Sequence, residues 1–339
     1  MKRLRHASHW LAFLLSAVLI YVVFRNVNWA EMRDSFHRAN YLWVVLGGVV
    51  GMGGFVVRAW GWQFLLRPMG RFRPVRLFTP VAIGYLANNV FPARLGEFVR
   101  AYVVGRREGI SKSAALATII VERVFDGLTL LLILAVVSIF YRFPAWVKVG
   151  GGLAAAVFLG VAVFLAVVTV KIRAALRLVD LTLGRWAPVL GGAMKARLEC
   201  FVAALDIRHH VANLAIAFLA CIVRWGFESA IYVCIVHAMQ LQVSPHGVLF
   251  VMVVVNIATM IPSAPGYVGT VQAACLAALP IFPGVDSTTA VTYSVLLHVD
   301  IFFPITITGI VCLIHSHLSL ASLRREEESA AASPAASGN

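Results

Sequence analysis

Charged residues are scarce in this sequence. They make up 13% of its 339 residues, whereas hydrophobic residues make up 60%, and the mean hydropathy is +0.86. A typical soluble domain carries about 25% charged residues. The shortage of charge excludes an ordinary water-soluble protein and indicates that the chain lies in a lipid bilayer.

Acidic residues are scarcer than basic ones. There are 15 Asp and Glu against 29 Lys and Arg, which gives a formal net charge of +14. A basic balance is typical of nucleic-acid binding proteins, but no soluble domain of any size is present to carry such a function. The basic residues lie in short loops instead, where they set membrane orientation and meet anionic headgroups. We therefore expect no nucleic-acid partner.

Cysteine pairs and catalytic motifs are also missing. The five cysteines include no C-x-x-C pair, so neither a disulfide framework nor a zinc site is indicated. No G-x-S-x-G, H-E-x-x-H, Walker A or dinucleotide-binding pattern occurs. The sequence thus predicts no catalytic residue, no metal, no cofactor and no energy supply from nucleotide hydrolysis.

Long apolar runs dominate what is present. A spanning helix needs about 20 mostly apolar residues. Two apolar regions, 77–104 and 247–282, are broken by Pro, Gly and polar residues. We predict an all-α integral membrane protein with about six full transmembrane helices and two re-entrant or broken helical hairpins, in one domain over 1–320. The six predicted spans are 10–25, 41–64, 113–140, 149–170, 211–236 and 288–314.

Basic loops predict the topology. Lys and Arg in short loops mark the cytoplasmic side, and they precede the first span and follow the last. Both broken regions must then make an even number of crossings, and they enter from opposite faces. We expect a cytoplasmic (inner) membrane location, both termini in the cytoplasm, a basic surface segment at 171–208 and a polar disordered tail at 321–339.

The two halves of the chain, 10–140 and 149–314, echo each other. Each half reads as span, span, broken hairpin and span, an odd number of crossings, which predicts a repeat inverted across the membrane. Chance similarity between apolar segments is the alternative. The matching pairs are Val57–Gly61 with Val223–Gly226, Asn89 with Asn256, Pro92 with Pro262, and Gly96 with Gly269.

The first hairpin contains a candidate anion site. Pro92 suits the first turn of a new helix, which stacks Arg94, Glu97 and Arg100 at i, i+3 spacing. A helix N-terminus with arginines favours phosphate. The alternative is a juxtamembrane loop with snorkelling arginines, above all for Arg100.

Three charges lie inside the predicted span 113–140. Each of Glu122, Arg123 and Asp126 costs roughly 2.5–3.5 kcal/mol at a helix centre on insertion scales. Their spacing places them on one arc, so they must face protein or water. They form either a structural ion pair or a site in which Arg123 holds a headgroup and a carboxylate takes up a proton.

Other spans carry charge as well. Arg224 and Glu228 stand at i, i+4, which favours a packing pair or a second part of the site. Asp300 lies in the last span, and His298 points roughly 200° away from it on a helix, so the two are not one site. The second hairpin breaks at Pro262, Pro265, Gly266 and Gly269, which is tolerable beside protein or a wet cavity, or in a simple turn.

Three motifs in this order carry a resemblance. The motifs are the run from Asn89 to Arg100, Glu122-Arg123-x-x-Asp126, and Pro262-x-x-Pro265-Gly266-x-x-Gly269. Together they resemble the family of lysylphosphatidylglycerol synthase transmembrane-domain, or flippase-like, membrane proteins. The resemblance implies lipid flippases or accessory transporters, with relatives linked to hopanoid and glycolipid export. The family's namesake enzyme adds a soluble aminoacyl-transferase domain, which we do not expect here. Gln272 stands where the family usually has an acidic residue.

We therefore predict translocation of a phospholipid or lipid-linked envelope precursor. The partner is a membrane lipid with an anionic or phosphate-bearing headgroup, and lipid-biosynthesis enzymes are further candidates. An integral-membrane transferase acting on a lipid phosphate, or an accessory scaffold, is the alternative. The candidate substrate-binding residues are Asn89, Arg94, Glu97, Arg100, Glu122, Arg123, Asp126, Arg224, Glu228 and Asp300, and the candidate structural breaks are Pro92, Gly96, Pro262, Pro265, Gly266 and Gly269.

Overall fold

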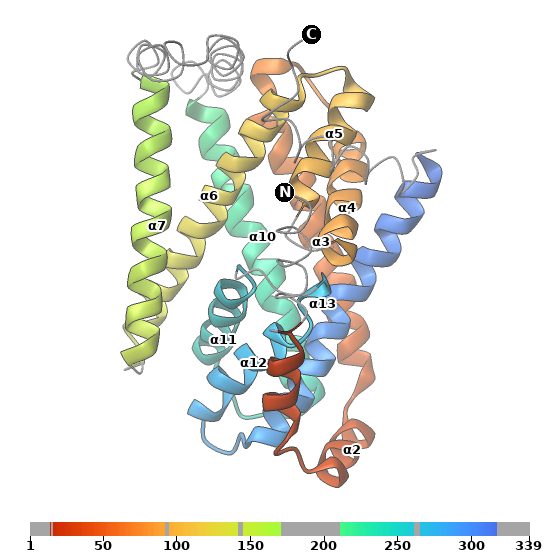
Figure 1. The fold of residues 1–339 in the computed structure, drawn as a ribbon, viewed down its shortest axis with the longest axis vertical. Helices are drawn as coiled ribbons and strands as arrows, with labels where there is room; N and C mark the ends of the chain where they lie inside the picture. The colour runs from red at the N-terminus through yellow and green to blue at the C-terminus, as the bar shows by residue number, and fades with distance from the viewer. Residues whose placement is uncertain are drawn as a thin grey trace.

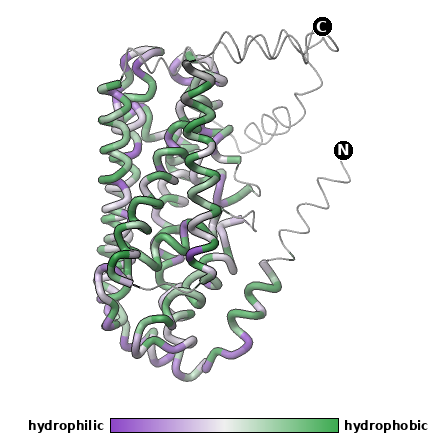
Figure 2. The backbone as a smooth tube through the Cα atoms, turned by 90° about the vertical axis from the view of Figure 1, so that its left-hand side faces the viewer, coloured by the Kyte–Doolittle hydropathy of each residue, from purple (hydrophilic) through white to green (hydrophobic). Residues whose placement is uncertain are grey.

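The protein is all-α in the part of the chain that the structure describes. The computed structural model describes residues 14, 16–91, 95–141, 145–170, 211–260 and 265–316, and these ranges contain helices and no strand (Figure 1). The predicted surface segment 171–208 and tail 321–339 lie outside these ranges. Figure 2 shows hydrophobic residues, in green, distributed along the length of the helices. The all-α membrane architecture is thereby confirmed.

Five helices within the described ranges are long enough to cross a bilayer. A helix of 25 residues rises about 37 Å, more than the ~30 Å hydrocarbon core. Four of the five are also apolar enough to span, and α6 is the one that carries three charges at mid-length. Residues 16–24 of the predicted first span are helical. The long helices are α3 (Tyr41–Leu65), α6 (Lys112–Val137), α7 (Ala145–Val170), α10 (Val211–Ala238) and α13 (Ser287–His315).

Polar caps fix where several helices begin. The Asn28 side chain accepts from Glu31 N at the start of the short helix α2 (Trp29–Arg38), which the sequence did not predict. Asn40 accepts from Leu42 N to begin α3, and Ser111 accepts from Ala114 N to begin α6. These side chains satisfy N–H groups that the helices leave unpaired.

The two broken regions form helical hairpins, as predicted. The first consists of α4 (Pro74–Val90) and α5 (Gly96–Glu108), and the second of α11 (Pro245–Ala258), the 3-10 turns η4 (Pro265–Tyr267) and η5 (Leu279–Ile281), and α12 (Thr270–Ala278). All of their helices are shorter than the ~20 residues of a span. In Figure 1 the first hairpin occupies the upper half of the molecule and the second the lower half. Their ends meet at mid-height, where α4 packs against η4.

The glycines of α3 allow α10 to pack closely against it. The two helices run antiparallel, since Asn40 N donates to Ala238 O over 2.8 Å at one end and Gly61 faces Ala220 near the other. Small residues permit such close approach in membrane helices. The echoing segments, 57–61 and 223–226, lie on these two helices. Antiparallel packing, together with hairpins from opposite ends, is the geometry that an inverted repeat predicts.

Two of these glycines make a matched test. A Cβ at Gly51 would meet only the mobile end of Ile231, whereas a Cβ at Gly61 would lie 2.7 Å from Ala220 Cβ, which moves only with its backbone. Alanine gains about 1 kcal/mol of helix propensity over glycine at both positions. We expect Gly61→Ala to lower the thermal unfolding midpoint in detergent and Gly51→Ala to leave it equal or higher. Equal midpoints for the two variants would contradict this packing.

Candidate functional site

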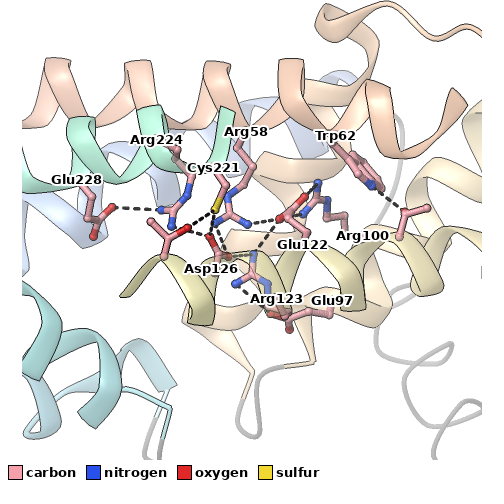
Figure 3. Close-up of polar contacts among 12 residues, drawn as sticks. Arg58, Trp62, Glu97, Arg100, Glu122, Arg123, Asp126, Cys221, Arg224 and Glu228 are labelled. Atoms are coloured by element: carbon pink, nitrogen blue, oxygen red, sulfur yellow. Dashed lines mark hydrogen bonds and ion pairs between the residues drawn. The ribbon is translucent and has the colours of Figure 1, made fainter. Parts of the chain in front are cut away.

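Charged side chains from four helices gather inside the apolar bundle. They include four arginines and four carboxylates, so their formal charges balance. We call this group the charge cluster, and Figure 3 shows that its members point toward one another. Its members are Arg58 on α3, Glu97 and Arg100 on α5, Glu122, Arg123 and Asp126 on α6, and Arg224 and Glu228 on α10.

Glu122 and Asp126 are the two acceptors at the centre of the cluster. Arg100 binds Glu122 through both terminal nitrogens, each over 2.8 Å. Arg58 binds Glu122 and also donates to Asp126 over 2.9 Å, while Arg224 donates to the other Asp126 oxygen over 2.7 Å. Hydrogen bonds from guanidinium groups to both oxygens of a carboxylate offset much of the desolvation cost of burying these charges.

Aromatic rings hold three of the arginines in place. The Arg100 guanidinium lies 3.7 Å from the Trp62 ring centroid, and Arg224 lies 4.0 Å from that of Trp225. Arg58 lies over Tyr85. Cation–π contacts of this kind strengthen when they are desolvated. Together with the carboxylates they fix Arg58, Arg100 and Arg224, whose side chains are at most 9% exposed.

Arg123 differs from the other arginines of the cluster. Its side chain is 34% exposed. One terminal nitrogen, Nη2, is shared between Glu122 at 2.9 Å and Asp126 at 3.2 Å. The other, Nη1, faces Glu97 over 4.0 Å, the longest ion pair in the cluster. Arg123 therefore retains donor capacity toward a further anion.

Arg123 opens onto a central cavity of about 400 Å³. This volume falls in the range of small-molecule sites. Both halves of the chain line the cavity, and its wall includes two pairs of matched residues, Arg58 with Arg224 and Asn89 with Asn256. Aromatic and aliphatic side chains form most of the remaining wall.

The break of the second hairpin forms part of the cavity wall, through Gly266 and Tyr267. Gly266 and Gly269 have φ of 71° and 86°, in the left-handed region that favours glycine. Gln272 accepts from Gly269 N over 2.8 Å and lies 3.2 Å from the His298 ring nitrogen. Gln272 thus ties the break to α13 through hydrogen bonds, whereas the family pattern suggested a carboxylate there.

The structure brings most of the predicted residues together. The charge cluster contains seven of them: Glu97, Arg100, Glu122, Arg123, Asp126, Arg224 and Glu228. Asn89 lines the cavity and donates to Thr306 over 2.7 Å, and Asp300 lines the cavity outside the cluster. Arg94, Pro92 and Pro262 lie outside the described residues.

Two details differ from the sequence interpretation. Arg100 is 3% exposed and bound to Glu122, so it does not snorkel. Arg224 lies closer to Asp126, at 2.7 Å, than to Glu228, at 3.8 Å, because α6 and α10 pack together. α5 begins at Gly96 in the described part of the chain, where Gly96 N donates to Asn88 Oδ1 over 2.7 Å.

Arg58 is the residue that sequence reasoning missed as part of the site. The sequence marks it only as part of the repeated Val57–Gly61 segment. A lone arginine inside the apolar run 41–64, matched in the repeat to Arg224, was the available signal. Trp62, Tyr85 and Cys221 have no comparable signal, because apolar spans commonly contain such residues.

The comparisons with known proteins agree with this architecture. The chain is 30% identical over 118 residues to Glycosyltransferase AglD of Haloferax volcanii, a match that covers 34% of this chain and 19% of that protein. It is 24% identical over 129 residues to a UPF0104 membrane protein of Methanocaldococcus jannaschii, covering 37% and 38% of the two. The matches therefore span well under half of either relative, and no solved structure gives a significant match.

A family model supplies the broadest match. The model described as the lysylphosphatidylglycerol synthase TM region matches residues 9–309, nearly the whole chain. That span includes the charge cluster, both hairpins and the cavity. The chain is thus a multi-pass membrane protein that belongs to the family of the lysylphosphatidylglycerol synthase transmembrane region.

Proposed function

We propose that this protein translocates a phospholipid or a lipid-linked envelope precursor across the cytoplasmic membrane, with the lipid phosphate bound at Arg123. The observation that carries the proposal is the position of Arg123. It is the one arginine of the charge cluster with a substantially exposed side chain, and it faces a cavity between two half-membrane hairpins. We place the basic loops, and with them both termini, on the cytoplasmic side.

Phosphate binding at Arg123 follows from the chemistry of the guanidinium group. A guanidinium fork binds phosphate oxygens in a bidentate manner. The Arg123 Nη1 interaction with Glu97 over 4.0 Å is weak enough to be exchanged for a phosphate, while Nη2 stays anchored to Glu122 and Asp126. Binding then needs no disruption of the three buried arginines.

The cavity suits a headgroup better than a whole lipid. At about 400 Å³ it lies near the lower end of the range for small-ligand sites. We infer that the headgroup occupies the cavity while the acyl or prenyl chains stay in the bilayer. The chains then stay in hydrocarbon throughout. The main free energy cost of moving the lipid is the transfer of its charged headgroup, and the cavity lowers that cost.

The connection between the halves suggests how access alternates. Arg224 of the second half binds Asp126 of the first half, and the two hairpins meet at mid-height. Rocking of one half against the other around a fixed site is the usual route of alternating access in inverted-repeat transporters. We propose that the Arg224–Asp126 pair is the pivot of this motion.

The test is lipid movement in reconstituted liposomes. Fluorescent phospholipids and a membrane-impermeant quencher report the label that changes leaflet. We expect the wild-type protein to accelerate this exchange and Arg123→Ala to reduce it at least tenfold, because the phosphate loses its donor. Arg106 lies at the exposed end of α5, so Arg106→Ala is the matched control. We expect it to exchange lipid at the wild-type rate. Normal exchange in a folded Arg123→Ala protein would defeat the proposal.

A transferase acting on a lipid phosphate is the second candidate. The name of the Haloferax volcanii relative is the observation that favours it. A translocase changes only the sidedness of a lipid, whereas a transferase forms a new product from a soluble donor. Product formation without any change of leaflet would move the assignment to the transferase, and an accessory role beside lipid-biosynthesis enzymes would give neither result.

A further inference from the structure

Asp300 occupies the place in the second half that Asp126 occupies in the first. Asp126 is the fifteenth residue of α6 and Asp300 the fourteenth residue of α13, and a valine precedes each by five positions, at Val121 and Val295. Both aspartates line the central cavity. Each half therefore presents one aspartate to the same space, beside one glutamate, Glu97 or Glu228.

The surroundings of the two aspartates are opposite in kind. Asp126 is bound by three arginines and by the Cys221 thiol. Asp300 is 6% exposed, and no hydrogen bond or ion pair joins it to any residue in the described ranges. Its Oδ2 is buried without a partner and lies against Gly47 of α3, and its Oδ1 lies near Gly48.

Within the described residues, no counter-charge reaches Asp300 from the helices around it. Cys234 of α10 is its one ionisable near neighbour there, and α3 presents glycines to it. Glu228 and Arg224 pair with each other, and His298 of α13 is engaged by Gln272 of α12. α2 contributes nothing to the cavity wall. The other ionisable groups that line the cavity are Arg58, Tyr85, Glu97, Arg123, Asp126, Tyr232 and Tyr267.

A buried carboxylate in such surroundings has two ways to lower its free energy. It binds a cation or it takes up a proton, because an isolated buried charge is very costly. A metal cation needs several oxygen ligands, and the glycine face of α3 offers none, since helical carbonyls are already hydrogen-bonded. A proton needs no further ligand.

We propose that Asp300 is a proton-binding site that couples lipid movement to proton movement. The coupling rests on the function proposed above, whereas the proton site does not. A proton from cavity water forms an O–H bond with a carboxylate oxygen of Asp300 while the cavity is open to one side. The neutral group permits the cavity to occlude, and the proton returns to water once the cavity opens to the other side.

Carbodiimide labelling tests the site without any transport. Dicyclohexylcarbodiimide reacts with protonated carboxyl groups in apolar surroundings and adds its mass to the protein. By mass spectrometry we expect one label, mapped to Asp300, that declines as the pH rises and is absent from Asp300→Asn. Glu228→Gln is the matched control and should label as wild type. Absence of label at every pH, a label that does not respond to pH, or a label on Glu228 would overturn the proposal.

Transport under an imposed pH gradient tests the coupling. In the liposome assay we expect a gradient to change the wild-type rate of leaflet exchange severalfold, and Asp300→Asn to lose this response. Labelling at Asp300 without lipid movement would uphold the proton site and reject the proposed function. Lipid movement that ignores the gradient in both proteins would reject the coupling and leave the proposed function standing.

Discussion

Replacing Glu122 by alanine should be among the most destabilising single changes in this protein. Glu122 is 7% exposed and accepts from three arginines. Without it Arg58 and Arg123 keep Asp126, but Arg100 loses its carboxylate partner. Leaving one partner of a buried ion pair uncompensated costs about 3–5 kcal/mol. We expect a large drop in the thermal unfolding midpoint of the detergent-solubilised protein.

A second substitution separates lost charge pairing from lost packing. Arg100→Met in the Glu122→Ala background removes the unpaired cation and restores the charge balance of the cluster. We expect the double variant to be clearly more stable than Glu122→Ala alone, since coupling between contacting residues reaches about 0.5–3 kcal/mol. Arg76→Met is the control, because Arg76 is 65% exposed and its 3.7 Å pair with Glu108 is worth about 1 kcal/mol or less. Additive effects of the two changes would show that the arginine and the glutamate are not energetically linked.

Local sequence patterns predicted the broken hairpins and the charges within spans. Prolines and glycines in an apolar run, and the i, i+4 spacing of Glu122 and Asp126, are signals contained within one segment. The same reasoning joined Arg224 to Glu228, although Asp126 lies closer to Arg224 in the structure. Spacing within a helix predicts which residues share a face. It does not predict which residues of another helix pack against that face.

Arg58 shows what such patterns leave out. Its partners Glu122 and Asp126 lie 64 and 68 residues away along the chain. Only the packing of α3 against α6 and α10 brings them together, and the glycines of α3 permit the close approach of α10. Asp300 is the reverse case, since the sequence marked it as a buried charge but did not reveal that its neighbours are glycines.

The turn of the first hairpin connects this packing to the site. Gly96 begins α5, and its neighbours Glu97 and Arg100 are members of the charge cluster. The α4 backbone runs directly beside Gly96, so a Cβ there would overlap the Gly84 carbonyl oxygen and would lie 2.6 Å from the Asn88 side chain. A backbone atom within a helix has little freedom to move away. Relief therefore requires α5 to shift from α4, which carries Arg100 away from Glu122.

Gly96→Ala should consequently impair both stability and lipid movement. Overpacking typically costs about 1–3 kcal/mol, and we expect the upper end because the displaced helix also weakens the Arg100 bonds to Glu122. The measurements are the thermal unfolding midpoint in detergent and leaflet exchange in liposomes. Gly226→Ala on α10 is the matched control, because nothing lies within 4 Å of a Cβ at that position. A Gly96→Ala protein as stable and as active as Gly226→Ala would mean that α4 and α5 do not pack so closely in the membrane, and that Arg100 is held in the cluster by its charge alone.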